Sequence, residues 1–230
     1  MAKACVALVL LLAAWSASAF DLDEVEARTQ HEFDTRLAAY AASDRVVYDV
    51  APNRALDLVF VRLLAAAFER YPNARRLRWE LQLVRDEEIS AECYSDGRIL
   101  LSKAFVQRYA RDEDQLAFVL GHEIGHALAQ HVRGYYLAAA TKIDVVGLTS
   151  DLLFENVATN GALRMSLAPL SREQEMEADR IGVMLATRAG FARRGAEDVL
   201  RDFVRSGEDA GDWAHGSAQE RLDEIVRSGR

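Results

Sequence analysis

Residues 122–126 read His-Glu-Ile-Gly-His, and three of them carry side chains that could do chemistry together. Successive residues of an α-helix turn by about 100°, so His122 and His126 lie on one helical face. Two imidazole nitrogens at this spacing can bind one zinc ion. Glu123 lies beside them, where its carboxylate can take a proton from a water molecule activated by that zinc. The pentapeptide therefore predicts a hydrolytic zinc site.

The segment around this motif, residues 115–133, contains no proline and is mostly apolar, which predicts a buried helix. Its polar side chains fall on a single stripe about 100° wide on a helical wheel. The stripe consists of Gln115, His122, Glu123, His126, Gln130 and Arg133. Unpaired charge is costly to bury, so these groups need a partner, and a metal cation would satisfy them. A motif with three fixed positions also occurs by chance, so the interpretation needs a further ligand elsewhere in the chain.

A catalytic zinc usually has three protein ligands and an open position for water. His131 is the nearest candidate, but on an unbroken helix it would face roughly 140° away from His126. We therefore interpret His131 as a surface or capping histidine. Glu175 and Asp179 are better candidates, because they flank the apolar face of a predicted helix. We expect Glu175 to be the third zinc ligand, with Asp179 accepting the free ring N–H of a ligand histidine.

The rest of the chain predicts a mostly helical α+β fold with a small β-sheet or hairpin beside the motif helix. Alternating apolar and polar residues at 77–83 predict a strand, and the turn residues 95–97 predict a hairpin over residues 89–101. Residues 134–168 show no clear period, and we expect short helices bounding a cleft there. Helices are expected over residues 21–43, 54–71, 103–133 with a break near Asp112, 171–188, 194–206 and 218–227.

Residues 1–19 have the pattern of a secretory signal peptide, in which a lysine precedes a short apolar run. Ala17 and Ala19 fit the small-residue positions before a cleavage site, so we expect cleavage after Ala19. A single domain over residues 20–230 would then be exported to a bacterial periplasm. An uncleaved membrane anchor is the alternative, although the apolar run is short for a membrane span.

Composition limits the partners of the chain. The formal net charge is −8, and no long basic run is present, which disfavours nucleic-acid binding. No segment after the signal peptide reaches 18 consecutive apolar residues, so we expect no transmembrane segment in the mature chain. The mature chain keeps a single cysteine, Cys93, and therefore cannot form an internal disulfide.

The pentapeptide, followed by Ser-Arg-Glu-Gln-Glu-Met-Glu-Ala-Asp over residues 171–179, resembles the HtpX-like zinc metallopeptidases (metallopeptidase family 48). These are gluzincins with a zincin-type fold, in which the Glu of an E-x-x-x-D motif is the third zinc ligand. The resemblance covers roughly residues 89–227 and implies these roles for Glu175 and Asp179. Some members are embedded in the membrane, whereas this chain is similar to the exported, periplasmic branch.

The same family carries a late histidine followed by an arginine, which regulate the site or stabilise the reaction intermediate. His215 and Arg221 occupy these places here, so the resemblance implies a catalytic role for His215 and transition-state support by Arg221. Gly216 stands where the family has a proline, a departure that changes the geometry of this loop.

These features together imply a zinc endopeptidase with one zinc ion per chain. Glu123 would act as the general base, and the substrate would lie extended along the edge of the hairpin at residues 89–101. The resemblance implies misfolded outer-membrane or periplasmic proteins as substrates. The alternative function is a zinc-stabilised periplasmic chaperone or assembly factor with latent protease activity.

Overall fold

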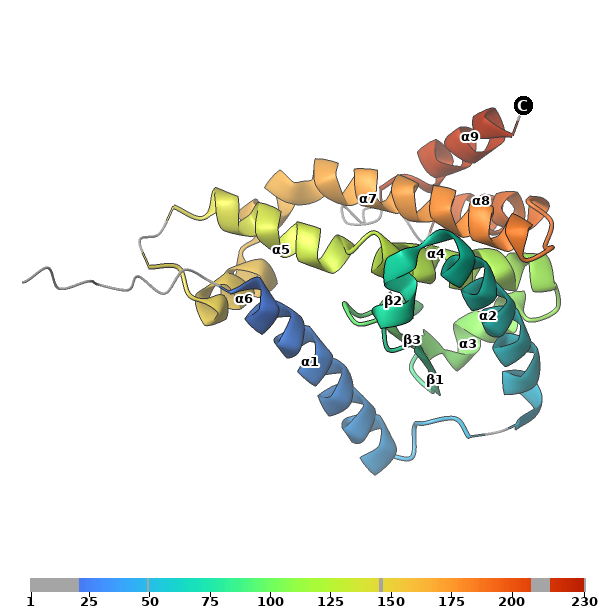
Figure 1. The fold of residues 1–230 in the computed structure, drawn as a ribbon, viewed down its shortest axis with the longest axis horizontal. Coiled ribbons are helices and arrows are strands. Elements are labelled where there is room, and N and C mark those ends of the chain that lie inside the picture. The colour runs from blue at the N-terminus through green and yellow to red at the C-terminus, as the bar shows by residue number, and fades with distance from the viewer. Residues whose placement is uncertain (1–20, 49, 145–146, 208–215, 230) are drawn as a thin grey trace, which may run out of the picture.

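The computed structural model describes residues 21–48, 50–144, 147–207 and 216–229. Most of this part of the chain is helical, and a small sheet lies beneath the helices (Figure 1). The predicted mostly helical α+β fold is therefore confirmed. The predicted signal peptide, residues 1–19, lies outside the described residues.

The helices follow the apolar periodicity of the sequence closely over much of the chain. Asp112 separates two of them as predicted, because its side chain accepts a hydrogen bond from the backbone N–H of Asp114 at 2.9 Å and so begins a new helix. Their bounds are α1 Leu22–Ala42, α2 Val50–Arg70, the 3-10 helix η1 Pro72–Arg76, α3 Lys103–Tyr109, α4 Glu113–Leu128, α5 His131–Lys142, α6 Ser150–Thr159, α7 Gly161–Arg188, α8 Arg194–Ser206 and α9 Ala218–Ser228.

The sheet has the strand order β1-β3-β2, with β1 at Glu80–Val84, β2 at Ala91–Cys93 and β3 at Arg98–Ser102. Strands β2 and β3 are antiparallel and form the predicted hairpin, whose turn contains Gly97 at φ +92°. Strand β1 runs parallel to β3. Since β3 is central, β2 is an edge strand of this sheet.

Helix α4, which carries the pentapeptide, lies in the middle of the molecule. It packs against α2, α7, α8 and strand β2 (Figure 1). Its apolar face joins the largest hydrophobic core, where Leu120 and Ile124 are fully buried against side chains of α2, α7 and the sheet. The motif is therefore held on a rigid element, which is the arrangement that a precise ligand geometry needs.

Two differences from the predicted helices matter. Helix α7 begins at Gly161 rather than near residue 171, because the side chain of Asn160 caps its first turn by accepting a hydrogen bond from the N–H of Leu163 at 3.0 Å. The helix then continues through Pro169. The predicted helix 103–133 also breaks a second time, because α4 ends at Leu128 and Gln130 adopts a left-handed conformation with φ +56°.

Residues 134–168 form most of α5, all of α6 and the beginning of α7. Their buried side chains, among them Ala139, Leu153 and Leu167, pack with Val25 of α1 in a separate hydrophobic cluster. Among the described residues of this segment, none lines the cavities next to the motif. The prediction of short helices is therefore confirmed in part, but the expected cleft lies elsewhere.

Within the part of the chain that the structure describes, no helix combines the length and the apolar character needed to span a bilayer.

Candidate metal centre

Helices α4 and α7 bring His122, His126 and Glu175 together as one possible metal-binding group. The Nε2 atoms of the two histidines are 3.0 Å apart, and Glu175 places carboxylate oxygens 3.4 Å from the Nε2 of His122 and 3.3 Å from that of His126. Nitrogen and oxygen ligands lie about 2.0–2.2 Å from a tetrahedral zinc, which puts them about 3.3–3.6 Å from one another. The donor types and the two nitrogen–oxygen separations fit a zinc ion, whereas the two Nε2 atoms would move about 0.3 Å apart to bind it.

The two helices approach closely because glycine residues line their contact. A Cβ atom added to Gly182 would lie 2.8 Å from the backbone nitrogen of His122, and one added to Gly125 would lie 2.9 Å from the carbonyl oxygen of Ala178. Side chains at these positions would push α4 and α7 apart. Glycine here sets the distance at which the carboxylate of Glu175 meets the two imidazoles.

His122 is supported from behind by a buried ion pair. Its Nδ1–H donates to Asp179 at 2.8 Å, and both oxygens of Asp179 accept hydrogen bonds from Arg221 of α9 at 2.7 Å. Asp179 is 1% exposed and Arg221 7% exposed. Burial alone would raise the pKa of Asp179, but Arg221 and His122 lower it to about 2. The ring of His122 is therefore oriented by a carboxylate that stays ionised.

The carboxylates also determine the proton affinity of His122. Burial alone would lower the pKa of His122, whereas Glu175 and Asp179 raise it to about 10. The two carboxylates next to His122 give the site a negative charge, which favours a bound cation. Arg221 contributes a further contact, with its Nη1 3.0 Å from Glu175. Burial alone would lower the pKa of Arg221, but Asp179 and Glu175 leave it raised.

His126 is supported by His131, which was expected to face away from it on an unbroken helix. His131 is 5% exposed, and its Nδ1 lies 2.9 Å from the Nδ1 of His126. The prediction that His131 is a surface or capping histidine is wrong, because the helix breaks between the two residues. Burial and the neighbouring His126 lower the pKa of His131 to about 4. The break is marked by the left-handed conformation of Gln130. Because glutamine is common inside helices, the sequence did not predict this break.

Glu123 borders a cleft that is also lined by His122 and Glu175. This cleft has a volume of about 330 Å³ and is also bordered by Ala91 and Glu92 of the edge strand β2. Apolar side chains of α3, α4 and α8 also line this cleft. These are Phe105, Phe118, Val119, Val199 and Phe203. The carboxylate of Glu123 thus borders a space that can hold part of a peptide next to the candidate metal ligands.

The predicted roles of His215 and Arg221 have different outcomes. His215 lies outside the described residues, so its catalytic role stays a prediction. Arg221 borders the cleft, but its described polar contacts are with Asp179, Glu175 and the Nδ1 of His122, which makes it a support for these groups. Gly216 has φ +69°, a conformation that proline cannot adopt, so this loop differs from the family pattern.

Two histidines one helical turn apart and a glutamate from a second helix form a ligand set that is typical of zinc peptidases. The chain belongs to Peptidase family M48, whose sequence profile matches residues 51–227. The predicted family is therefore confirmed, and a mostly helical fold with a small sheet is consistent with its zincin-like architecture.

Curated relatives of this chain carry the names of proteases. The chain is 33% identical over 153 residues to the mitochondrial metalloendopeptidase OMA1 of Arabidopsis thaliana, a match that covers 63% of the chain and 30% of that relative. It is 30% identical over 175 residues to the β-barrel assembly-enhancing protease of Yersinia pestis, covering 71% of the chain and 35% of the relative. The protein of the same name from Escherichia coli is 26% identical over 144 residues, covering 57% and 29%. The chain thus spans only about a third of the length of these relatives.

Proposed function

We propose that this protein is a zinc-dependent endopeptidase with one zinc ion held by His122, His126 and Glu175. The observation that carries the proposal is the convergence of one possible ligand atom each from His122, His126 and Glu175, all within 4.8 Å of one another, from α4 and α7. Zinc in such a site supplies Lewis acidity, which acidifies a water molecule and polarises the scissile carbonyl. Membership of a metallopeptidase family supports the same assignment.

Glu123 is the general base in this proposal. Its carboxylate follows His122 directly on α4 and borders the cleft, so it can take a proton from the attacking water. The same carboxylate then passes the proton to the leaving amine. Arg221 and Asp179 contribute by holding the ligands in place, and the ring of His215 supports the developing oxyanion.

The substrate lies extended along the outer edge of β2, to which it adds as a further strand. Support comes from the cavities at the two ends of this strand: Ala91 and Glu92 border the cleft, whereas Cys93 borders a second cavity of about 340 Å³ next to His126. Since Glu123 must reach the leaving amine, the residue after the scissile bond lies on the cleft side. The apolar wall there favours a large apolar side chain at that position.

We further propose a periplasmic location after removal of residues 1–19, with residues 20–230 acting as one metallopeptidase domain. Unfolded outer-membrane or periplasmic proteins are the proposed substrates. The pattern of the first nineteen residues and the β-barrel assembly named in one group of relatives support this location. Another group of relatives is mitochondrial by name. Fractionation of the cells that produce the chain, followed by immunodetection in each fraction, tests the proposed periplasmic location.

The test compares the zinc-loaded mature chain with its Glu123→Gln variant on an unfolded model protein such as casein. We expect the wild type to cleave it and the variant to lose about 10²–10⁴-fold in rate, while both bind one zinc ion with similar affinity. A variant that cleaves as fast as the wild type would contradict the role of Glu123. Cleavage by neither protein, with equal suppression of aggregation by both, would favour the chaperone function. A His215→Ala variant that gains activity would identify a latent protease.

A further inference from the structure

The two candidate histidine ligands each use one ring nitrogen toward the metal and leave the other free for the protein. In His126 the Nε2 faces His122 and Glu175, so the Nδ1 is the nitrogen left over. A histidine that binds metal through Nε2 carries its proton on Nδ1 and needs an acceptor there. The atom 2.9 Å from that Nδ1 is the Nδ1 of His131.

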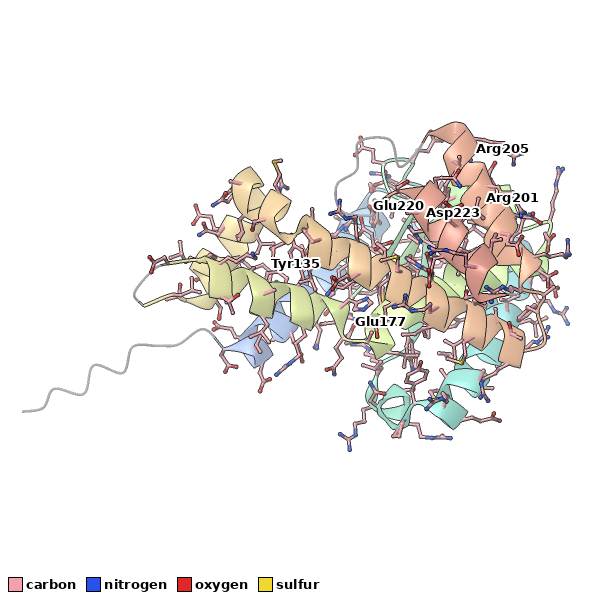
Figure 2. All side chains as sticks on the ribbon, turned by 90° about the horizontal axis from the view of Figure 1, so that it is seen from above. Tyr135, Glu177, Arg201, Arg205, Glu220 and Asp223 are labelled. Atoms are coloured by element: carbon pink, nitrogen blue, oxygen red, sulfur yellow. The ribbon has the colours of Figure 1, made fainter. Side chains whose placement is uncertain are left out.

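We propose that His131 is a positioning residue for the metal centre, which accepts the Nδ1–H of His126 and thereby fixes the ring of that ligand. The proposal rests on the metal site proposed above. His131 must then be the tautomer that carries its proton on Nε2. That nitrogen lies 3.4 Å from a carboxylate oxygen of Glu177, which can accept it. Figure 2 labels Glu177 on α7, where this helix passes the beginning of α5.

Two features of the surrounding structure direct His131 toward His126. The left-handed conformation of Gln130 ends α4 and turns the chain, so that residue 131 faces back toward the motif. The side-chain amide of Gln174 donates to the backbone carbonyl of His131 at 3.0 Å and ties the first turn of α5 to α7. The two imidazole rings then meet edge to face, with centroids 4.8 Å apart and an interplanar angle of 79°.

This arrangement makes α7 the common support of the whole centre. It supplies the third ligand Glu175, the acceptor Asp179 for His122, and two contacts to His131 through Gln174 and Glu177. A histidine acceptor carries no charge of its own, so it can be buried without a counter-ion. Loss of such an outer acceptor typically weakens metal binding by about 10–100-fold.

The test measures the zinc dissociation constant of the full mature chain by competition with a chromogenic chelator. His131→Asn places an amide oxygen near the former Nδ1 and keeps an acceptor, whereas His131→Phe keeps the bulk and removes it. We expect about a 10–100-fold higher dissociation constant for His131→Phe and less than about a 5-fold change for His131→Asn. His31→Phe, at an exposed histidine of α1, is the matched control and should bind zinc like the wild type.

Two further readouts separate positioning from folding. The melting temperature of the metal-free variants should match that of the wild type, and the visible spectrum of the cobalt-substituted protein should shift in His131→Phe only. Equal zinc affinity of wild type and His131→Phe would overturn the proposal, as would an equal loss in both His131 variants, which would indicate a packing role. Failure of the wild-type chain to bind zinc would instead overturn the proposed function, and this inference with it.

Discussion

The two histidines of the motif lie one helical turn apart, yet the protein supports them with different chemistry. Behind His122 is a buried carboxylate, Asp179, which is itself held by Arg221. Behind His126 is the neutral ring of His131, followed by Glu177, whose side chain is 53% exposed. The first support is an ion pair sealed inside the fold, whereas the second is a short hydrogen-bonded path that ends in solvent.

This difference predicts that the two sides of the centre contribute to different properties. A buried ion pair is strongly destabilising once one partner is removed, because the other charge is left in the interior. A neutral imidazole leaves no such charge when it is replaced. We therefore expect changes on the His122 side to affect folding and metal binding together, and changes on the His126 side to affect metal binding alone.

The largest effect is expected for Asp179→Asn. It leaves the buried guanidinium of Arg221 without its principal carboxylate, which should lower the free energy of unfolding of the metal-free chain by about 3–5 kcal/mol. Chemical denaturation followed by circular dichroism measures this loss. Glu173→Gln, at an exposed carboxylate on the same helix, is the control and should leave stability unchanged. Equal denaturation midpoints for Asp179→Asn and wild type would contradict the claim that the support behind His122 contributes to folding.

An intermediate effect is expected for Gly182→Ala, which acts on both sides at once. The added methyl group would lie 2.8 Å from the backbone of His122 and force α4 and α7 apart. We expect a loss of about 1–3 kcal/mol in stability together with weaker zinc binding, because Glu175 moves away from the histidines. Gly161→Ala is the matched control in the same helix, since nothing lies within 4 Å of its added Cβ. Unchanged zinc affinity in Gly182→Ala would argue against the close helix contact.

The smallest effect is expected for Glu177→Gln, at the solvent end of the His131 path. Exposed pairs of this kind contribute less than about 1 kcal/mol, so the zinc dissociation constant should rise by less than about 5-fold. The same chelator competition measures it. A loss as large as that of His131→Phe would show that the two sides are built alike, with a carboxylate as the effective acceptor on each.

Much of the centre was predictable from the chain, because its residues follow helical spacing. His122 and His126 lie one turn apart on α4, and Glu175 and Asp179 lie one turn apart on α7, so a pattern within each helix places them correctly. That the two helices meet follows from the family resemblance. The small residues Ala178 and Gly182 in the sequence allow the close contact, in which backbone atoms of α4 lie beside Gly182.

The contact between His131 and His126 was not predicted, because it depends on the backbone conformation of Gln130. Glutamine is a good helix former, so the sequence favours a continuous helix through Gln130. The structure instead places Gln130 in a left-handed conformation, and Gln174 of α7 donates a hydrogen bond to the carbonyl of the following residue, His131. The early start of α7 also depends on local structure, since the side chain of Asn160 caps its first turn and the helix continues through Pro169.

The central claim is that α4 and α7 hold a single zinc ion between His122, His126 and Glu175. Anomalous diffraction at the zinc absorption edge, from crystals of residues 20–230, tests it most directly. The account predicts one strong peak about 2.0–2.2 Å from the Nε2 of each histidine and from a carboxylate oxygen of Glu175. A zinc-supplemented crystal without this peak, or with Glu175 turned away from it, would contradict the account.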